Sequence, residues 1–215
     1  MVLDAFGLAL LRDMAVIIAY HHAHAQENAI NGFGTVVGSA KAGYVRWFNI
    51  ERAMLNLLAG KYPHASVEYT QNESNQNKHV EVVTANCRLQ FIHDSNPEAK
   101  VPKSDYGNLA VTNNQPLLFP NFAPPPGLAD KFGAVLFHSK GEPGQLPKAL
   151  SLRFPSGDYG ELCAPEPLFE LFEDLDCVEA VIAAYGQLQP PSHAPEEDPG
   201  DTAHPTINPA SNTGS

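Results

Sequence analysis

Two short segments that alternate polar and apolar residues, a pattern typical of β-strands, carry two glutamates and a histidine. Glu68 lies in the segment 66–70, and His79 and Glu81 lie two residues apart in the segment 79–84. Residues two apart in a strand point to the same face, and Glu68 joins that face if the strands are neighbours. Two carboxylates beside an imidazole can hold a divalent metal or share acid–base work. We therefore take this polar face as the candidate catalytic site, with a divalent metal as the cofactor it implies.

A predicted hairpin formed by 79–84 and 87–93 would position this face. A two-residue turn pairs Val82 with Leu89 on the apolar side of the hairpin. The opposite face then carries Glu68, His79, Glu81, Arg88 and Gln90. The alternative is a solvated polar face without a function, because alternation alone produces such faces.

Other metal motifs in the sequence are incomplete. The run His79-Val80-Glu81 matches the H-x-E fragment of zinc deaminases, but the P-C-x-x-C half of that motif is missing. A second group of potential ligands lies near the end of a predicted N-terminal helix: His21, His22, His24 and Glu27. Steps of three residues drift around a helix, and the H-E-x-x-H motif is absent, so this group predicts no metal site.

The three cysteines, Cys87, Cys163 and Cys177, form no C-x-x-C pair. This favours free thiols in a reducing compartment.

Hydrophobic periodicity predicts an α+β fold. Apolar residues at helical spacing indicate helices over 2–30, 44–60 and 165–186. A candidate N-cap at Ser104, with Asp105 in the first turn, indicates a further helix over 105–113. Period-two segments indicate strands over 66–70, 79–84, 87–93, 132–138 and 149–154. Short links between neighbouring strands favour a mainly antiparallel sheet of about five strands, backed by helices.

The expected organisation has three parts. Residues 1–43 form an N-terminal helix followed by a flexible glycine-rich connection at 32–43, and residues 44–188 form the α+β domain. The tail at 189–215 contains six prolines, four acids and a single large aliphatic residue, so we expect it to be disordered.

The order of elements from residue 44 resembles the core of the PD-(D/E)xK nuclease fold. Members of that family place a lysine two residues after a strand carboxylate. Here Glu68 is followed by Tyr69-Thr70, and Glu81 is followed by Val82-Val83. The resemblance therefore concerns topology alone: it implies metal-dependent nuclease chemistry but transfers no residue roles.

Charge is divided sharply along the chain. All 13 Lys and Arg residues lie in 1–153 together with 12 acids, whereas 154–215 holds 12 acids and no Lys or Arg. Nucleic-acid binding needs clustered cations, so this acidic third argues against it and favours a basic protein partner. The acids expected to meet that partner are Glu170, Glu173, Asp174 and Glu179.

The sequence also bears on location. No apolar run reaches the ~18 residues that a membrane span needs. The apolar run 14–20, followed by Ala23-His24-Ala25, is similar to a signal peptide, but Asp4 and Asp13 argue against that interpretation. With free thiols, this favours a cytoplasmic protein that contacts no membrane.

Two functions follow as expectations. The first is a non-enzymatic binding protein of the inhibitor, immunity-factor or regulatory-subunit type, which engages its partner through the acidic third and needs no cofactor. The second is a metal-dependent hydrolase or nuclease that uses Glu68, His79 and Glu81.

Overall fold

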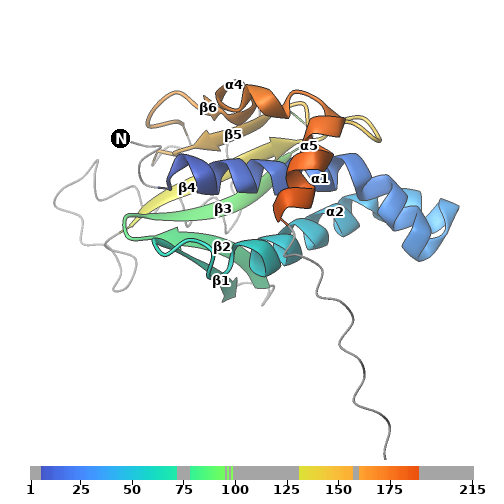
Figure 1. The fold of residues 1–215 in the computed structure, drawn as a ribbon, viewed down its shortest axis with the longest axis horizontal. Helices are drawn as coiled ribbons and strands as arrows, with labels where there is room; N and C mark the ends of the chain where they lie inside the picture. Colours follow the sequence, from blue (N-terminus) through green and yellow to red (C-terminus); the bar gives the residue numbers. More distant parts are fainter. Residues whose placement is uncertain are drawn as a thin grey trace, which may run out of the picture.

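Helices cover one face of a six-stranded sheet in the computed structural model, which describes residues 6–71, 78–94, 96, 98, 131–156 and 160–188 (Figure 1). The predicted α+β class is confirmed. The predicted helix over 105–113 and the predicted disordered tail over 189–215 lie outside the described residues.

The strands lie side by side in the order in which they occur in the chain. They are β1 (Ala65–Gln71), β2 (Lys78–Thr84), β3 (Cys87–Asp94), β4 (Phe132–Ser139), β5 (Leu150–Arg153) and β6 (Glu166–Pro167). Strands β3 and β4 are parallel, and all other neighbours are antiparallel, so the sheet is mixed rather than purely antiparallel. A parallel pair needs a long crossover, and the stretch between Asp94 and Phe132 is long enough to provide one.

The hairpin register predicted from the sequence is confirmed at its centre, where Val82 pairs with Leu89. On the other side of β2, Glu81 lies directly opposite Glu68 of β1. The pairing of β2 with β3 covers Val82↔Leu89 and Val83↔Arg88.

Two long antiparallel helices, α1 (Leu8–Phe33) and α2 (Thr35–Leu58), lie on one face of the sheet (Figure 1). Gly34 joins them with a φ of 74°, a conformation that favours glycine. Because α1 ends at Phe33 and α2 begins at Thr35, three of the glycines expected in a flexible connection lie inside helices: Gly32, Gly38 and Gly43. Gly38 packs so closely on α1 that an added Cβ would lie 2.6 Å from the Ala29 carbonyl oxygen. Close helix packing therefore overrides the low helix propensity of glycine here.

The hydrophobic core lies between these helices and the sheet. Buried apolar side chains come from α1 (Leu10, Leu11, Met14, Ile17, Ile18), from α2 (Ile50, Met54, Leu58) and from the strands (Val80, Val82, Leu89, Ala134, Leu136). The first helix is thus a central part of the core. None of the described helices is long and apolar enough to cross a membrane.

The predicted helix over 165–186 is divided in the structure. It consists of α4 (Leu168–Leu171), the 3₁₀ helix η2 (Glu173–Leu175) and α5 (Val178–Leu188), which packs against α1 (Figure 1). The apolar stripe still faces inward, since Leu168, Leu175 and Val181 are fully buried. The break comes at Phe172, whose φ of −120° and ψ of 73° are not helical.

Candidate functional site

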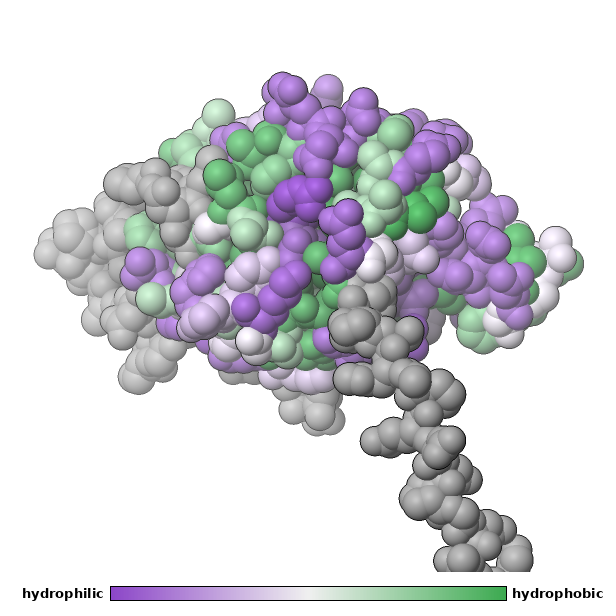
Figure 2. Space-filling view, in the orientation of Figure 1, coloured by the Kyte–Doolittle hydropathy of each residue, from purple (hydrophilic) through white to green (hydrophobic). Residues whose placement is uncertain are grey.

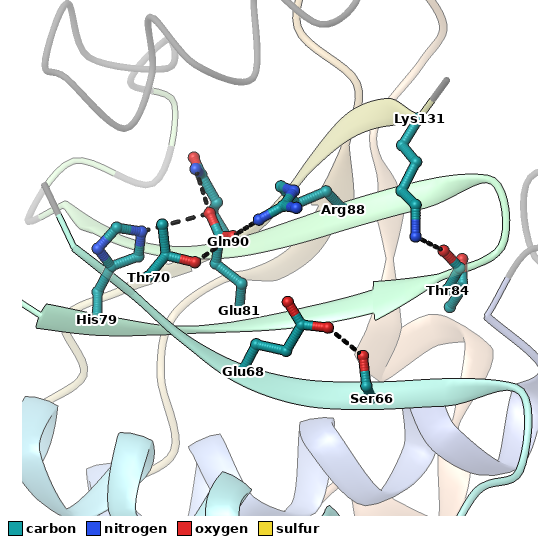
Figure 3. Close-up of polar contacts among 9 residues, drawn as sticks. All are labelled: Ser66, Glu68, Thr70, His79, Glu81, Thr84, Arg88, Gln90 and Lys131. Atoms are coloured by element: carbon teal, nitrogen blue, oxygen red, sulfur yellow. Dashed lines mark hydrogen bonds and ion pairs between the residues drawn. The ribbon is translucent and has the colours of Figure 1, made fainter. Parts of the chain in front are cut away.

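The polar sheet face predicted from the sequence centres on one buried carboxylate, Glu81 (Figure 3). It accepts hydrogen bonds from Thr70 Oγ1 at 2.7 Å and Gln90 Nε2 at 2.8 Å. Arg88 forms an ion pair with it, and His79 Nε2 lies 3.3 Å from its Oε1. The expectation that this face is either solvated or an open site does not describe Glu81, whose exposed fraction is 0%.

The three candidate residues of this face are only partly brought together. His79 and Glu81 are in contact, whereas the exposed Glu68 accepts a 2.6 Å hydrogen bond from Ser66 Oγ on its own strand (Figure 3). Glu68 is the cross-strand neighbour of Glu81, but its carboxylate turns along β1 toward Ser66.

Electrostatics keep Glu81 charged near neutral pH. Burial alone would raise its pKa, but hydrogen bonds from His79, Gln90, Thr70 and Arg88 outweigh burial and lower the pKa to about 2. A carboxylate held ionised by four donors is a poor proton acceptor near neutral pH, because general-base efficiency is greatest for a pKa near the working pH. Its surroundings suit a structural role, and a catalytic role for this face stays a prediction.

The acidic residues predicted to meet a partner lie at the molecular surface. Glu170, Glu173, Asp174 and Glu179 are all exposed, on α4, η2 and α5. Figure 2 shows hydrophilic side chains gathered over the part of the molecule where α4 lies. Asp174 forms an ion pair with Arg12 of α1, so its charge is partly neutralised within the chain.

A second cluster joins three histidines from three elements: His22 of α1, His93 of β3 and His138 of β4. His93 and His138 are paired in the parallel register and point to the same face of the sheet, near the carboxyl ends of their strands. Helix α1 lies across that face and brings His22 to them. One potential ligand atom from each histidine lies within 4.8 Å of the others.

The geometry of this histidine cluster is tight and partly open. His22 Nε2 and His138 Nδ1 share a 2.8 Å hydrogen bond, and their rings meet edge to face at 5.0 Å. His22 and His138 are buried, with exposed fractions of 5% and 4%, whereas His93 is exposed. The cluster is therefore anchored in the interior and accessible from solvent on the His93 side.

The cluster is uncharged near neutral pH. Burial, followed by the neighbouring His138 and Arg46, places the pKa of His22 far below its ordinary value, and burial does the same for His138. Burial and the charge of Arg46 lower the pKa of His93 to about 4. Neutral imidazoles are the form that binds metals, because a protonated ring nitrogen has no lone pair to offer.

Arg46 of α2 is a fourth member of this region. Its guanidinium donates a 2.8 Å hydrogen bond to His93 Nε2, and its side chain is itself buried. A guanidinium carries five donors and recognises carboxylates and phosphates. Its charge opposes a cation at the histidines and favours an anion beside them.

The residues present fit a zinc ion. Zinc binds histidine nitrogen at about 2.0–2.1 Å, which places ligand nitrogens about 3.3 Å apart in a tetrahedron. The 2.8 Å contact between His22 and His138 would have to open by only about half an ångström for both nitrogens to hold a zinc ion. Three histidines with one open position are the ligand set of catalytic rather than structural zinc sites.

Sequence reasoning placed His22 in a different group and did not consider His93 or His138 as ligands. Two histidines grouped with His22 in the sequence, His21 and His24, contact Tyr185 and Tyr20 instead of the cluster. One signal was present, because His93 and His138 each end a predicted strand. Comparisons of the chain with known protein families, with curated proteins and with solved structures found no match.

Proposed function

We propose that the protein is a zinc-dependent hydrolase whose ion is held by His22, His93 and His138. The observation that carries the proposal is the convergence of three neutral histidines within 4.8 Å, two buried and one exposed. This retains the metal-dependent hydrolase considered from the sequence but assigns it to residues other than Glu68, His79 and Glu81.

The chemistry follows from the open coordination position. Zinc lowers the pKa of a bound water to about 7, which supplies a hydroxide nucleophile at neutral pH. Because His93 is exposed, a substrate reaches that position from the solvent side. Arg46, which already contacts His93, is placed to stabilise the negative charge that develops on a carbonyl or phosphoryl oxygen.

The proposal is tested first by metal binding to protein without a purification tag. Metal-free protein is titrated with Zn²⁺ by calorimetry, and Co²⁺ is used to report coordination through its visible absorption. We expect one tight site with tetrahedral Co²⁺ bands in the wild type. His93→Ala should weaken binding at least about tenfold, since second-shell changes alone cost about 10–100-fold and His93 is a direct ligand.

The matched control is His24→Ala on the same helix as His22. His24 stacks on Tyr20 and bonds the Tyr20 carbonyl oxygen, away from the cluster, so its loss should leave zinc binding unchanged. Arg46→Gln should tighten zinc binding, because it removes an opposing charge. Equal zinc affinity in wild type, His93→Ala and His24→Ala would exclude the site.

Hydrolysis is tested separately with p-nitrophenyl acetate and bis(p-nitrophenyl) phosphate. We expect turnover that requires zinc, is lost in His93→Ala, and falls in Arg46→Gln even though that variant binds zinc more tightly. Zinc binding without turnover of either substrate would leave a metal-binding protein and overturn the hydrolase.

A second candidate is the binding protein expected from the charge distribution. The exposure of Glu170, Glu173 and Glu179 favours it, because these acids are free to meet a basic partner in the cytoplasm. Reversing these three charges to Lys should slow association with such a partner at low salt, where surface charges are least screened. An association rate that does not depend on salt would exclude this role.

A further inference from the structure

A polar cavity of about 220 Å³ lies where α1, α2 and α5 meet, apart from the histidine cluster. Its polar lining consists of His21, Asn49, Arg52, Asn56 and Tyr185. Its apolar lining consists of Ala53 and Leu57. No aspartate or glutamate of the described residues lines it, although acids outnumber Lys and Arg in the chain by 24 to 13.

Helix α2 supplies most of this lining through its periodicity. Asn49, Arg52 and Asn56 are three and four residues apart, so they lie on one face of the helix. Arg52 lies 5.8 Å from the ring of Phe48, and no hydrogen bond joins it to the residues that the structure describes. The two asparagine amides likewise make no hydrogen bond within the described part of the chain. Five guanidinium N–H groups and two amides thus remain available to a ligand.

His21 contributes a buried side chain to the lining of the cavity. The side chain is 93% buried, and its Nε2 lies 3.3 Å from the Tyr185 hydroxyl. Its Nδ1 is buried without a hydrogen-bond partner among the described residues. Nδ1 has almost no accessible surface, so the ring must shift before a ligand can accept from it. An unsatisfied buried polar group costs about 1–3 kcal/mol, and this contact would recover that free energy. Nδ1 is the donor when Nε2 accepts from the Tyr185 hydroxyl.

We propose that this cavity binds a small organic oxyanion, whose carboxylate or phosphate group is held by Arg52, Asn49, Asn56 and His21. The donors line one cavity without a competing acid among the described residues, and a guanidinium holds either group with two parallel hydrogen bonds. The volume accommodates a ligand larger than a bare ion, whose apolar part lies against Ala53 and Leu57. This site goes beyond the hydrolase and does not depend on it.

The experiment uses four probes on the full chain: inorganic phosphate, acetate, phenyl phosphate and benzoate. Binding is followed by calorimetry and by the nitrogen NMR shift of the His21 ring. We expect benzoate or phenyl phosphate to bind at least about tenfold more tightly than acetate or inorganic phosphate, with a change at His21 Nδ1. The comparison of benzoate with phenyl phosphate, and of acetate with inorganic phosphate, distinguishes a carboxylate from a phosphate ligand.

Variants identify the residues responsible. Arg52→Gln should weaken binding about tenfold, the scale of a hydrogen bond to a charged group. Lys41→Gln removes one exposed charge from the same helix outside the cavity and should have no effect. Both residues are exposed, so both variants are expected to fold.

One further variant separates this cavity from the zinc site. Arg46→Gln acts on the histidine cluster and should leave binding of the probes unchanged. Loss of binding in Arg46→Gln with retention in Arg52→Gln would assign the anion to the histidine cluster and overturn the proposal. Equal weak binding of all four probes, or an unchanged His21 ring, would also overturn it. Failure of zinc binding would leave this result untouched, because all measurements are made on metal-free protein.

Discussion

His93 and His138 lie directly opposite each other in the parallel pair β3–β4 and differ in exposure. His138 is buried beneath α1 and contacts His22, whereas His93 faces solvent and contacts Arg46. One member of the pair therefore belongs to the core and the other to the surface. The two positions should respond differently to substitution and to metal.

Zinc should stabilise the wild type by an amount that rises with the logarithm of the free zinc concentration above Kd. At a free zinc concentration of about 100 times Kd, the free energy of unfolding should rise by about 2.7 kcal/mol. His93→Ala should lose this increase, and it should also lower the free energy of unfolding of the metal-free protein by about 1–3 kcal/mol, because the buried Arg46 guanidinium loses its hydrogen-bond acceptor. Urea denaturation with and without zinc measures both effects. An equal zinc effect in His93→Ala and wild type would contradict the assignment of the ligand.

Two glycines of the helical hairpin should respond in opposite directions to alanine. Gly38→Ala places a Cβ 2.6 Å from backbone atoms of α1, so it should destabilise the fold by about 1–3 kcal/mol. Gly32→Ala meets no atom within 4 Å and lies in a helix, so it should stabilise the fold by about 0.5–1 kcal/mol. Thermal unfolding of the two variants checks the pair. Similar shifts for both would show that the helices do not pack closely at Gly38.

Glu81→Ala should be strongly destabilising, at about 3–5 kcal/mol, because it removes one partner of a buried ion pair and leaves several donors unsatisfied. Glu68→Ala on the neighbouring strand should change the free energy of unfolding by less than about 0.5 kcal/mol, since that side chain is exposed. Chemical denaturation of both variants tests the contrast. A small effect of Glu81→Ala would mean that the carboxylate does not organise this face.

Acid should remove the contribution of Glu81 in a defined range of pH. Its pKa in the folded chain, about 2, lies below the ordinary value of about 4.3, so the unfolded chain binds the proton first. The stabilisation is present above about pH 4.3 and is lost as the pH falls toward 2. The loss is about 3 kcal/mol. The difference in unfolding free energy between wild type and Glu81→Ala, measured over this range, should shrink accordingly; a constant difference would be inconsistent with the depressed pKa.

The fold was largely predictable because its signals are local. Alternation of apolar residues predicted β1 to β4 within two residues of their bounds, and the hairpin turn predicted the Val82–Leu89 pair. The flexible connection predicted from the glycines between 32 and 43 was wrong. The close packing of Gly38 on Ala29 is a tertiary contact, and helix propensity does not include it.

The histidine cluster was not predictable for a related reason. In an antiparallel arrangement of neighbouring strands, His93 and His138, which each end a predicted strand, lie at opposite edges of the sheet. Only the parallel pairing of β3 with β4 brings them together, and only the docking of α1 adds His22. Spacing along the chain cannot report a contact that spans 116 residues.

The backbone of β2 is joined to the helical layer by a polar contact as well as by the apolar core. The Val80 amide donates a 3.1 Å hydrogen bond to Glu51 Oε1 of α2, at a point beyond the pairing of β2 with β3. Exchange of the Val80 amide hydrogen with solvent therefore requires its contact with Glu51 of α2 to break, and it does not require β3 to detach. That one amide should exchange together with the helical hairpin in native-state hydrogen exchange, although it belongs to a strand.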